Sequence, residues 1–557
     1  MKPITIITLS LATVSSLFSA APTIGDAQRQ VQPPREVQES PDTLIPSLLV
    51  EDLKEPMVEE SGKMIEVKSF KITGALHVKT EILQELLSSY KNQSHSFSEL
   101  QKIASLITRY YREHGFFVAR AYIPKQVMHE GILEIAIIEG KYGDFHLSNS
   151  SLVSDTQIQA MLDDVKDANI VSVNSLERAM LLINATPGAK VTAADVKPAQ
   201  TVGASDFDIA VSGTEPYSAY IVGDNYGSQY TGRYRINLGL SANSPLGYGD
   251  KLGMNGVVST TSDLKNGKLY YNFPLAANGL RGEVSASRTT YSLAKEYESL
   301  DALGNATTLE ASLIYPIFKT RLESFDISLG YAHKNMKDEV RSTDTVTKKE
   351  SDAANLTLAY TRSCLLFGLN TFTNASVTLT HGNLSFKDAD ALAIDQAGAQ
   401  TDGDYDKISG SIEKTVHFNP EYALTASLRF QKALGNKNLD GSEDFSLGGA
   451  YGVRAFPEGE HSAEDGYLLG AELFYTLPSY EGITHKASIF ADTGYATMEN
   501  KMSGSESRHL SDLGFGYQAS YKQFFTKAQI AHVIGAEKVE SESDHSTRVL
   551  LQIGYIY

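Results

Sequence analysis

The residue types that most often catalyse reactions or bind metals are scattered along this chain. The 13 histidines form no HExxH pair, no G-x-S-x-G elbow or phosphate-binding loop is present, and Cys364 is the only cysteine. A single cysteine excludes an intrachain disulfide and a thiolate metal cluster. Carboxylates alternate in residues 402–406 (DGDYD), but the remainder of a calcium loop is missing, so an exposed loop is the better interpretation. The sequence therefore predicts no enzyme, no cofactor and no metal site.

The chain ends in an extended segment with two unlike faces. Within residues 548–557 (RVLLQIGYIY), alternate positions carry either mostly large apolar side chains, namely Val549, Leu551, Ile553, Tyr555 and Tyr557, or more mixed ones, namely Leu550, Gln552, Gly554 and Ile556. Similar alternation recurs in residues 234–241, 325–332 and 422–431. Strands in soluble proteins average about 5–6 residues, whereas about 9–11 residues cross a bilayer at a tilt. The repetition favours a membrane β-barrel over a soluble sandwich.

The composition limits the class of protein further. A chain of 557 residues has room for several domains, and no mature segment approaches the run of about 18 apolar residues that a spanning helix needs. The formal charge of −18 argues against nucleic acid as a partner. Tryptophan is absent, so interfacial aromatic girdles would have to come from the 29 tyrosines and 22 phenylalanines.

The first residues are typical of a secretory signal peptide. Lys2 precedes a short apolar stretch, and small residues follow at positions 19–21. Cleavage after Ala21 fits the small-x-small rule but places Pro22 just past the cut, and a second candidate lies after Ala27, so the site stays open within residues 19–27. Residues 28–63 have the composition of a linker with room for one short helix.

Two copies of one α+β unit follow the linker, at residues 64–141 and 142–213. In the first copy we expect a strand at 65–72, a helix at 80–87, a second helix opened by the capping box of Ser96 and Glu99, and strands at 116–123 and 132–138. The same order of elements repeats in the second copy at residues 144–147, 156–164, 175–184, 190–194 and 206–211. Such a tandem array predicts two docking modules.

Residues 214–557 are expected to form the barrel. At about 10 residues per strand plus connections, this length accommodates about 16 strands. Longer, charged connections are expected at residues 338–352, 387–407 and 501–509, on the side that faces the exterior.

Several motifs together give a specific resemblance to a known family. Residues 448–460 (GGAYGVRAFPEGE) resemble the inward-folded sixth loop of the outer-membrane assembly-factor superfamily, and residues 490–494 (FADTG) resemble its partner strand motif. Further segments are similar to two-partner secretion transporters of the TpsB type, such as FhaC, ShlB and HecB, namely residues 115–140, 176–188, 224–227 and 246–250. The resemblance covers nearly all of residues 65–557.

The resemblance implies the site residues of the barrel. The loop motif falls on Val453, Arg454, Ala455 and Phe456, and the family's loop arginine reaches a strand aspartate, here Asp492, which stands between Phe490 and Gly494. A guanidinium can hold a loop through a bidentate contact worth about one to a few kcal/mol in a hydrated lumen. Whether this pair is a static brace or a moving latch stays open.

The two small units resemble POTRA domains, which implies that they bind an unfolded client in the periplasm by strand addition. Tyr111, Arg120 and Tyr122 of the first unit, all expected to be exposed, are the candidate client contacts. Tyr555 and Tyr557 are the candidate C-terminal barrel signal. Pro33-Pro34 would end an N-terminal helix early, so we do not expect a full-length helical plug.

The predicted fold is mainly β, with a transmembrane antiparallel barrel in a Gram-negative outer membrane and two periplasmic POTRA domains ahead of it. The implied function is secretion of one large TpsA-type exoprotein, similar to a haemagglutinin, adhesin or haemolysin, which is recognised through its N-terminal secretion domain. Outer-membrane lipid, the barrel-assembly machinery and periplasmic chaperones would be further partners. The alternatives are an insertase of the same superfamily and, less in keeping with two docking modules, a passive porin. The exoprotein, its activation and the oligomeric state are left open.

Overall fold

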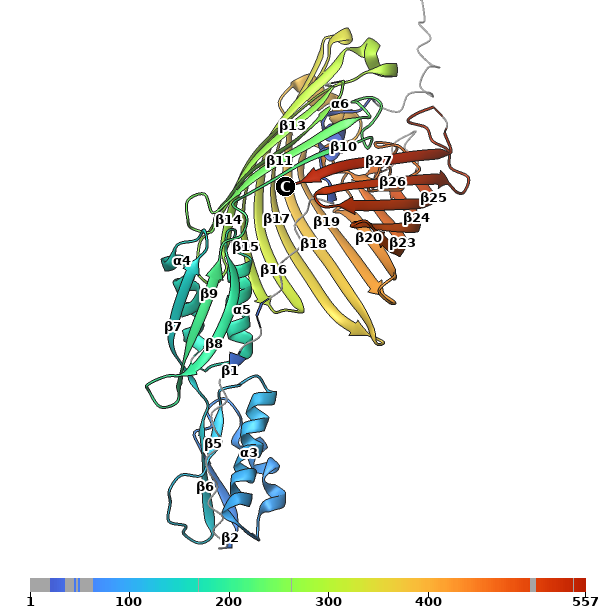
Figure 1. Cartoon of the computed structure of the whole chain (residues 1–557). Helices are drawn as coiled ribbons and strands as arrows, with labels where there is room; N and C mark the ends of the chain where they lie inside the picture. The colour runs from blue at the N-terminus through green and yellow to red at the C-terminus, as the bar shows by residue number, and fades with distance from the viewer. Residues whose placement is uncertain are drawn as a thin grey trace, which may run out of the picture.

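A computed structural model describes residues 21–35, 45–46, 49–50, 64–168, 170–261, 263–500, 507–543 and 545–557. The predicted signal segment up to residue 20 and most of the predicted linker lie outside these residues. The described chain forms a barrel, and two small α+β modules extend from one end of it in a line (Figure 1). In the part of the chain that is described, no helix combines the length and the apolar character that crossing a membrane requires.

Sixteen antiparallel strands close the barrel, as the sequence predicted. In order around the ring they are β10 (Tyr217–Asp224), β11 (Arg235–Asn243), β12 (Lys251–Ser259), β13 (Leu264–Pro274), β14 (Arg281–Ser292), β15 (Ala302–Lys319), β16 (Glu323–Val340), β17 (Thr345–Leu366), β18 (Leu369–Phe386), β19 (Gly403–His417), β20 (Tyr422–Leu434), β23 (Asp465–Tyr480), β24 (Ile483–Thr497), β25 (Arg508–Tyr521), β26 (Phe524–Val533) and β27 (Thr547–Ile556). The ring closes where β27 pairs with β10, with Tyr555 opposite Ile221.

The barrel strands turn their apolar side chains outward. On β27, Val549, Leu551 and Ile553 are 49, 51 and 63% exposed, whereas Leu550 and Gln552 between them are 0 and 2% exposed. A continuous outward row of large apolar side chains is stable only where lipid covers it. The alternation in the sequence therefore predicted correctly which side chains of this strand face outward.

One wall of the barrel is taller than the sequence predicted. Strands β15, β16, β17 and β18 have 18, 18, 22 and 18 residues, well beyond the roughly 9–11 that cross a bilayer. The expected long connection at residues 338–352 is instead the tip of the β16–β17 hairpin, which turns through η5 (Arg341–Thr343). The expected connection at 387–407 contains the short helix α6 (Ala389–Ala397), and residues 501–506 lie outside the described chain.

The first module is built on helix α3 (Phe97–Glu113). Ser96 caps this helix, because its Oγ accepts from the Glu99 N–H at 3.3 Å while its own N–H donates to Glu99 Oε2 at 2.8 Å. The remaining elements are β2 (Ile65–Val67), β3 (Ser69–Thr73), α2 (Thr80–Leu86), β4 (Gln93–His95), β5 (Arg120–Tyr122) and β6 (Ile132–Ile138). The strand expected at 116–123 is thus only three residues long, and it forms one edge of the sheet β3-β6-β5.

The second module repeats the plan with longer strands. Its elements are β7 (Lys141–Ser150), α4 (Asp155–Asp163), α5 (Val173–Asn184), β8 (Lys190–Pro198) and β9 (Ala204–Ser212). A two-residue strand of the linker, β1 (Leu49–Val50), pairs in parallel with β8, so the sheet order is β1-β8-β9-β7. The edge of this sheet therefore accepts an extended segment of the same chain.

Helix α5 joins the second module to the barrel. The Arg178 guanidinium donates to the carbonyl of Pro316 at 2.7 Å, near the end of β15. From the turn between β15 and β16, Arg321 contacts Glu177 at 2.7 Å and also donates to the carbonyls of the linker residues Ile45 and Pro46 at 3.2 and 3.1 Å. Module, linker and barrel rim meet at this point.

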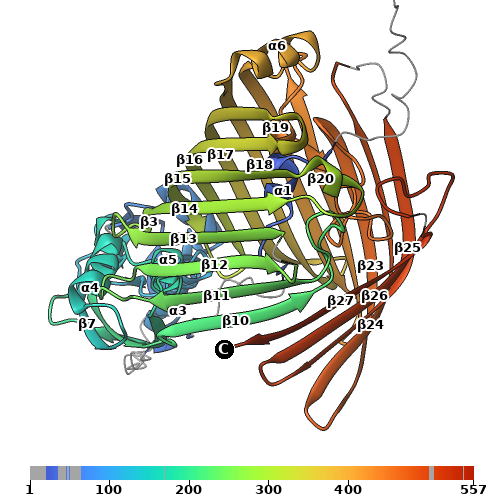
Figure 2. The ribbon, with the colours of Figure 1, turned by 90° about the horizontal axis from the view of Figure 1, so that it is seen from above.

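A short helix, α1 (Ile24–Arg29), lies inside the ring of strands (Figure 2). Its first N–H donates to Asp338 of β16 at 2.8 Å, and Ile24 packs into a lumenal cluster with Leu264, Tyr291 and Met336. This helix overlaps the predicted signal window. Cleavage after Ala27 would divide it, whereas cleavage after Ala21 would leave it whole.

Candidate functional site: the obstructed lumen

A long connection between β20 and β23, residues 435–464, folds back into the lumen, and we refer to it as loop 6. It contains η6 (Gly441–Glu443) and the small hairpin of β21 (Phe445–Ser446) and β22 (Ser462–Ala463). Its tip turns tightly at Gly449, whose φ of +95° favours glycine. The motif residues Val453, Ala455 and Phe456 are buried, so the loop packs against the barrel wall as a compact unit.

Arg454 joins loop 6 to three residues on neighbouring strands. Its guanidinium makes a bidentate contact with Asp492 of β24, at 2.7 Å from Nε and 3.2 Å from Nη2. Nη1 donates to Glu472 of β23 at 2.9 Å, and the guanidinium carbon lies 3.4 Å from the centroid of the Phe490 ring. The structure thus brings together Arg454, Asp492 and Phe490, while Gly494 leaves room for Leu447 of the loop, since an added Cβ there would lie 2.9 Å from Leu447 Cδ2.

Two further carboxylates belong to this contact, and the sequence reasoning missed both. Glu472 is the second acceptor of Arg454, and the Oδ2 of Asp512 accepts from the N–H of Ala455 at 2.6 Å. Asp512 lies directly opposite Asp492 in the β24–β25 ladder and is fully buried. Their positions could have identified both residues from the sequence, because each is a carboxylate at a lumen-facing position of a strand with alternating faces.

Other contacts fix the tip of loop 6 to the same part of the wall. Arg508 of β25 contacts Glu460 at 2.6 Å, and Arg548 of β27 donates to the carbonyl of Phe456 at 2.7 Å. The base of the loop is held elsewhere, since Glu443 contacts Lys407 of β19 at 2.8 Å. Loop 6 is therefore anchored at both its base and its tip.

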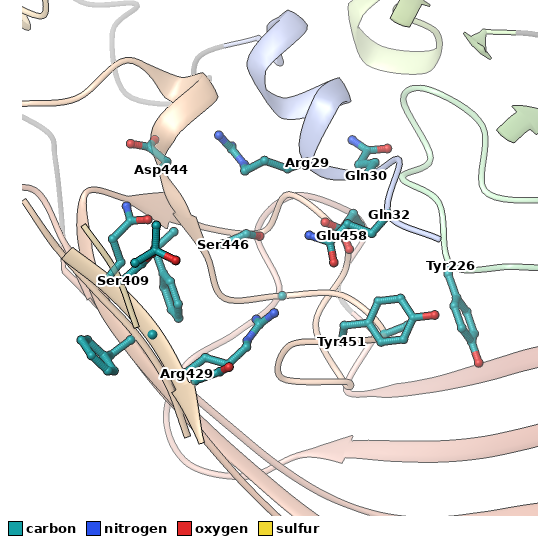
Figure 3. A pocket seen from close by; sticks show the side chains of 18 of the residues that line it. Arg29, Gln30, Gln32, Tyr226, Ser409, Arg429, Asp444, Ser446, Tyr451 and Glu458 are labelled. Atoms are coloured by element: carbon teal, nitrogen blue, oxygen red, sulfur yellow. The ribbon is translucent and has the colours of Figure 1, made fainter. Parts of the chain in front are cut away.

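A cavity of about 400 Å³ remains between loop 6, the end of α1 and the wall formed by β18–β20. Figure 3 shows Ser409 and Arg429 on the strand wall, Ser446 and Tyr451 on loop 6, and Arg29 at the end of α1, all around the same space. Loop 6 and α1 both contact the inner wall of the barrel beside this cavity, so they obstruct the channel in this structure.

The expected client contacts in the first module differ in exposure. Arg120 is exposed and Tyr122 is 39% exposed on the edge strand β5. Tyr111 is fully buried, so its expected exposure was wrong. It lies four residues after Ile107 and continues the buried stripe of α3 through Leu100, Ile103 and Ile107.

The buried Tyr111 hydroxyl donates to Glu139 Oε1 at 2.8 Å. Burial, together with the nearby Glu139 carboxylate, raises the pKa of Tyr111, so the phenol remains protonated. Tyr111 is therefore part of the module's core and of a polar contact inside it.

The two C-terminal tyrosines lie at the seam of the barrel. The Tyr557 N–H donates to the Ala219 carbonyl at 2.8 Å, and the Ala219 N–H donates to the Tyr557 carbonyl at 3.2 Å. The Tyr555 ring packs against Phe524 with a centroid distance of 4.9 Å. Both residues thus contribute to the contacts that close the ring.

Comparisons with known proteins agree with this architecture. The model of the family described as haemolysin secretion/activation protein ShlB/FhaC/HecB matches residues 203–519, more than half of the chain, and the ShlB-type POTRA domain matches residues 65–140. The heme/hemopexin transporter protein HuxB of Haemophilus influenzae is 25% identical over 419 residues, which cover 75% of this chain and 73% of HuxB. The outer membrane transporter CdiB of Dickeya dadantii is 22% identical over 418 residues, covering 72% of each chain. The solved structure of CdiB from Escherichia coli shares the fold, with a TM-score of 0.75 at 18% identity over 90% of this chain and 93% of that one.

Proposed function

The chain belongs to the haemolysin secretion/activation protein family ShlB/FhaC/HecB, and we propose from this that it exports one large exoprotein, recognised through an N-terminal secretion domain. It is an outer-membrane transporter of two-partner secretion whose POTRA domains lie in the periplasm. The family is one of transporters. The observation that carries the proposal is the combination of an obstructed lumen with two modules at its periplasmic end.

The first step is capture of an unfolded client by the modules. An extended segment can add to a sheet edge through main-chain hydrogen bonds, with little demand on its sequence. The pairing of β1 with Asp195 and Val196 of β8 supports this step, because it shows that the edge of the second module accepts such a segment. In the first module, Arg120 and Tyr122 lie on the edge strand β5, where an arriving strand would contact them.

The second step is passage through the barrel. Neither ATP nor a proton gradient is available at the outer membrane, so we expect folding of the client at the cell surface to give the movement its direction. The barrel wall supplies a partly polar duct, since its inward positions include polar residues such as Asp492, Asp512 and Gln552. An exoprotein variant that cannot fold but leaves the cell at the normal rate would contradict this source of direction.

The test is deletion of the gene from its host, followed by mass spectrometry of the culture supernatant. We expect one large secreted protein to disappear and to return with the wild-type gene, while the other outer-membrane proteins stay at their normal levels. A general loss of outer-membrane barrels would indicate an insertase instead. A variant lacking residues 64–212 that still restores the phenotype would indicate a porin.

A matched pair of variants tests the role of the module edge. Arg120→Ala with Tyr122→Ala should reduce secretion at least fivefold while the barrel remains assembled. Arg112→Ala is the control, because Arg112 is an exposed arginine of the same module that belongs to α3 and not to the edge strand. Equal effects of the two changes would exclude a specific role for β5.

A further inference from the structure

The hairpin that joins β17 to β18 ends in an apolar tip. Its turn is formed by residues 367 and 368, and the Phe367 side chain is 95% exposed. Leu365 and Leu366, which precede the turn, are 70 and 39% exposed. Two other two-residue turns, at residues 481–482 and 522–523, are polar. Exposed large apolar side chains that gather in one place are typical of a binding surface.

This tip lies at the periplasmic end of the barrel. Alternate turns of an up-and-down barrel lie at the same end, so the β17–β18 turn shares its end with the β15–β16 turn, where Arg321 contacts Glu177 of the second module. Figure 1 shows the β17–β18 hairpin reaching toward the end that carries the modules. The carbonyl of Leu322, a 63% exposed residue of the β15–β16 turn, accepts from the Ser363 N–H at 2.6 Å. Exposed apolar residues therefore continue from one turn to the next.

Part of the tip faces the lumen side of the wall. On β18, Ser376 and Thr378 line the cavity, so even-numbered positions face inward, and Phe372, which is 41% exposed, belongs to this set. Leu365 pairs with Asn370, so it lies on the same face, diagonally to Phe372. Because lipid surrounds only the outer face of a barrel, it cannot cover the side chains of Leu365 and Phe372.

The lipid-facing row of β17 ends before the tip. Leu356 and Tyr360 belong to its outward set, and the next outward residue, Arg362, pairs with Glu323 of β16 at 3.8 Å. Phe367 follows Arg362 by five positions, which is roughly 16 Å along the strand at about 3.3 Å per residue. The charged pair marks the end of the apolar row, so Phe367 lies beyond the hydrocarbon core of the membrane.

The turn itself does not favour an aromatic residue at position 367. Phe367 has a φ of +51° and Gly368 a φ of +80°, the left-handed conformation in which Asn-Gly is the preferred pair and a bulky residue is an outlier. Glu481 occupies the same place in the β23–β24 turn, with a φ of +49° before Gly482 at +82°. Since the Phe367 ring is too exposed to contribute packing within the barrel, its contribution lies in a contact outside it.

We propose that this apolar tip, formed by Leu365, Phe367 and Phe372 with Leu322 beside it, binds apolar stretches of the unfolded exoprotein as they pass from the modules to the lumen. The inference rests on the proposed secretion function. Burial of apolar surface is non-directional, so the contact requires no particular client sequence. Ser376 lies four positions further along the same face of β18, so a segment bound at the tip would lie at the entrance to the lumen.

The first experiment replaces the aromatic ring with the residue that the turn prefers. Phe367→Asn should assemble as well as the wild type and lose its faster gel mobility at the same or a higher temperature, while secretion falls at least fivefold. Phe367→Leu, which keeps an apolar side chain, should retain at least half of the secretion. Glu481→Asn is the matched control, because it makes the same change at the equivalent position of the β23–β24 turn, and its secretion should stay within twofold.

Two results of this experiment would overturn the proposal. Normal secretion by Phe367→Asn would show that the ring binds nothing that secretion needs. A parallel loss of assembled barrel and of secretion would assign Phe367 a structural role only.

The second experiment identifies what the tip contacts. The photo-crosslinking residue p-benzoylphenylalanine is placed at position 367 or, as the control, at position 481, and cells are irradiated during secretion. We expect residue 367 to crosslink to the exoprotein that gene deletion removes, at least fivefold more than residue 481 does. Crosslinks from residue 367 to lipid, to a second copy of the chain or to another part of the same chain, without the exoprotein, would overturn the proposal.

A third measurement needs no exoprotein. The full chain carrying the photo-crosslinking residue at position 367 is placed in nanodiscs with reduced, carboxymethylated α-lactalbumin, a permanently unfolded polypeptide. We expect a crosslink that Leu365→Ser with Phe372→Ser weakens at least fivefold. If gene deletion removed no secreted protein, the proposed function would be refuted, yet this crosslink would still show that the tip binds unfolded polypeptide. Its absence would overturn the binding role of the tip even in a chain that is required for secretion.

Discussion

Arg454 holds loop 6 through the shape of its guanidinium as well as its charge. The side chain contacts two oxygens of Asp492 and one of Glu472 and lies over the Phe490 ring, which a lysine ammonium cannot do simultaneously. We expect Arg454→Lys to weaken the contact by about 1–2 kcal/mol, which is roughly a fivefold to thirtyfold change in equilibrium. Arg454→Ala should cost more, because it leaves the carboxylates without any cation.

The measurement is the temperature at which the folded barrel loses its faster gel mobility, together with the amount of secreted exoprotein. Both should fall in the order wild type, Arg454→Lys, Arg454→Ala. Arg429→Lys is the control for loss of a ring contact. The Arg429 guanidinium also lies over a ring of loop 6, that of Phe445, with 5.7 Å between its carbon and the ring centroid. Equal transitions for wild type and Arg454→Lys would show that charge alone suffices.

Glu139 makes the first module sensitive to acid. Burial would raise the pKa of Glu139, but hydrogen bonds from the His77 side chain, the His77 and Leu76 N–H groups and the Tyr111 hydroxyl outweigh it and lower the pKa below its ordinary value of 4.5. A lowered pKa in the folded state gives stability that is present above the unfolded value and is lost as pH falls through the folded one. We therefore expect the module to loosen below about pH 4.5.

Hydrogen exchange of the α3 and β6 amides in the full chain, corrected for the intrinsic rate, measures this loosening. Glu139→Gln should weaken the module by about 2 kcal/mol at neutral pH and flatten its dependence on pH. Glu113→Gln, an exposed change at the end of α3, should leave the profile as in the wild type. A Glu139→Gln profile as steep as that of the wild type would place the acid sensitivity elsewhere.

The sequence predicted single residues well only where a motif fixed their partner. Arg454 and Asp492 were paired through the resemblance, whereas Glu472 and Asp512 stand outside any recognised motif. The strand ladder places Asp512 opposite Asp492 and Glu472 opposite Phe490, which no local pattern in the sequence reveals. The expected exposure of Tyr111 was wrong because this residue lies four positions after Ile107, on the buried stripe of α3. A shift of one position on a helix is about 100°, so one wrong position in the stripe is enough to reverse an expected exposure.

Helix α5 and the β15–β16 turn form the joint between module and barrel. Arg178→Ala with Arg321→Ala would remove the contacts to Pro316, Glu177 and the linker carbonyls. Each partly exposed contact contributes up to about 1 kcal/mol, so we expect a looser joint with an unchanged barrel. In a Cys364→Ser background, spin labels at Thr192→Cys and Asn374→Cys should show a broader distance distribution, and secretion should fall about twofold to fivefold.

The control for this joint is Arg362→Ala, a change at an exposed arginine of β17 that pairs with Glu323. It should leave the distance distribution as narrow as in the wild type. A narrow distribution in the double variant would show that apolar packing around α5 is sufficient to hold the module.

Elements were predictable where one physical signal dominated. The capping box of Ser96 fixed the start of α3, and alternation fixed the strands that face lipid. The tip of the β16–β17 hairpin was mistaken for a loop because residues 338–352 carry charges on both faces, and a strand that leaves the bilayer no longer needs one apolar face. Pairing with a neighbouring strand, which no local pattern reveals, decides its structure.

Closure of the barrel depends on the last three residues of the chain. They provide the final pairs of β27 with β10, the Tyr555–Phe524 contact and the two hydrogen bonds between Tyr557 and Ala219. An open sheet edge within lipid leaves backbone groups unpaired at several kcal/mol each. We expect deletion of residues 555–557 to reduce the amount of heat-modifiable barrel at least tenfold. The protein that fails to assemble should be degraded in the periplasm.

Two single substitutions at Tyr557 separate the contribution of its main-chain hydrogen bonds to barrel assembly from that of its side chain. Tyr557→Phe keeps both the ring and the main-chain bonds, so it should assemble as the wild type does, whereas Tyr557→Ala keeps only the bonds and should assemble to an intermediate level. Wild-type levels for Tyr557→Ala would mean that pairing with β10 alone closes the ring. Levels as low as those of the deletion would instead mean that the terminal aromatic is recognised during assembly, which is the role the barrel-assembly machinery would have as a partner. The same gel therefore separates a requirement for closing the cylinder from a requirement for reaching the membrane.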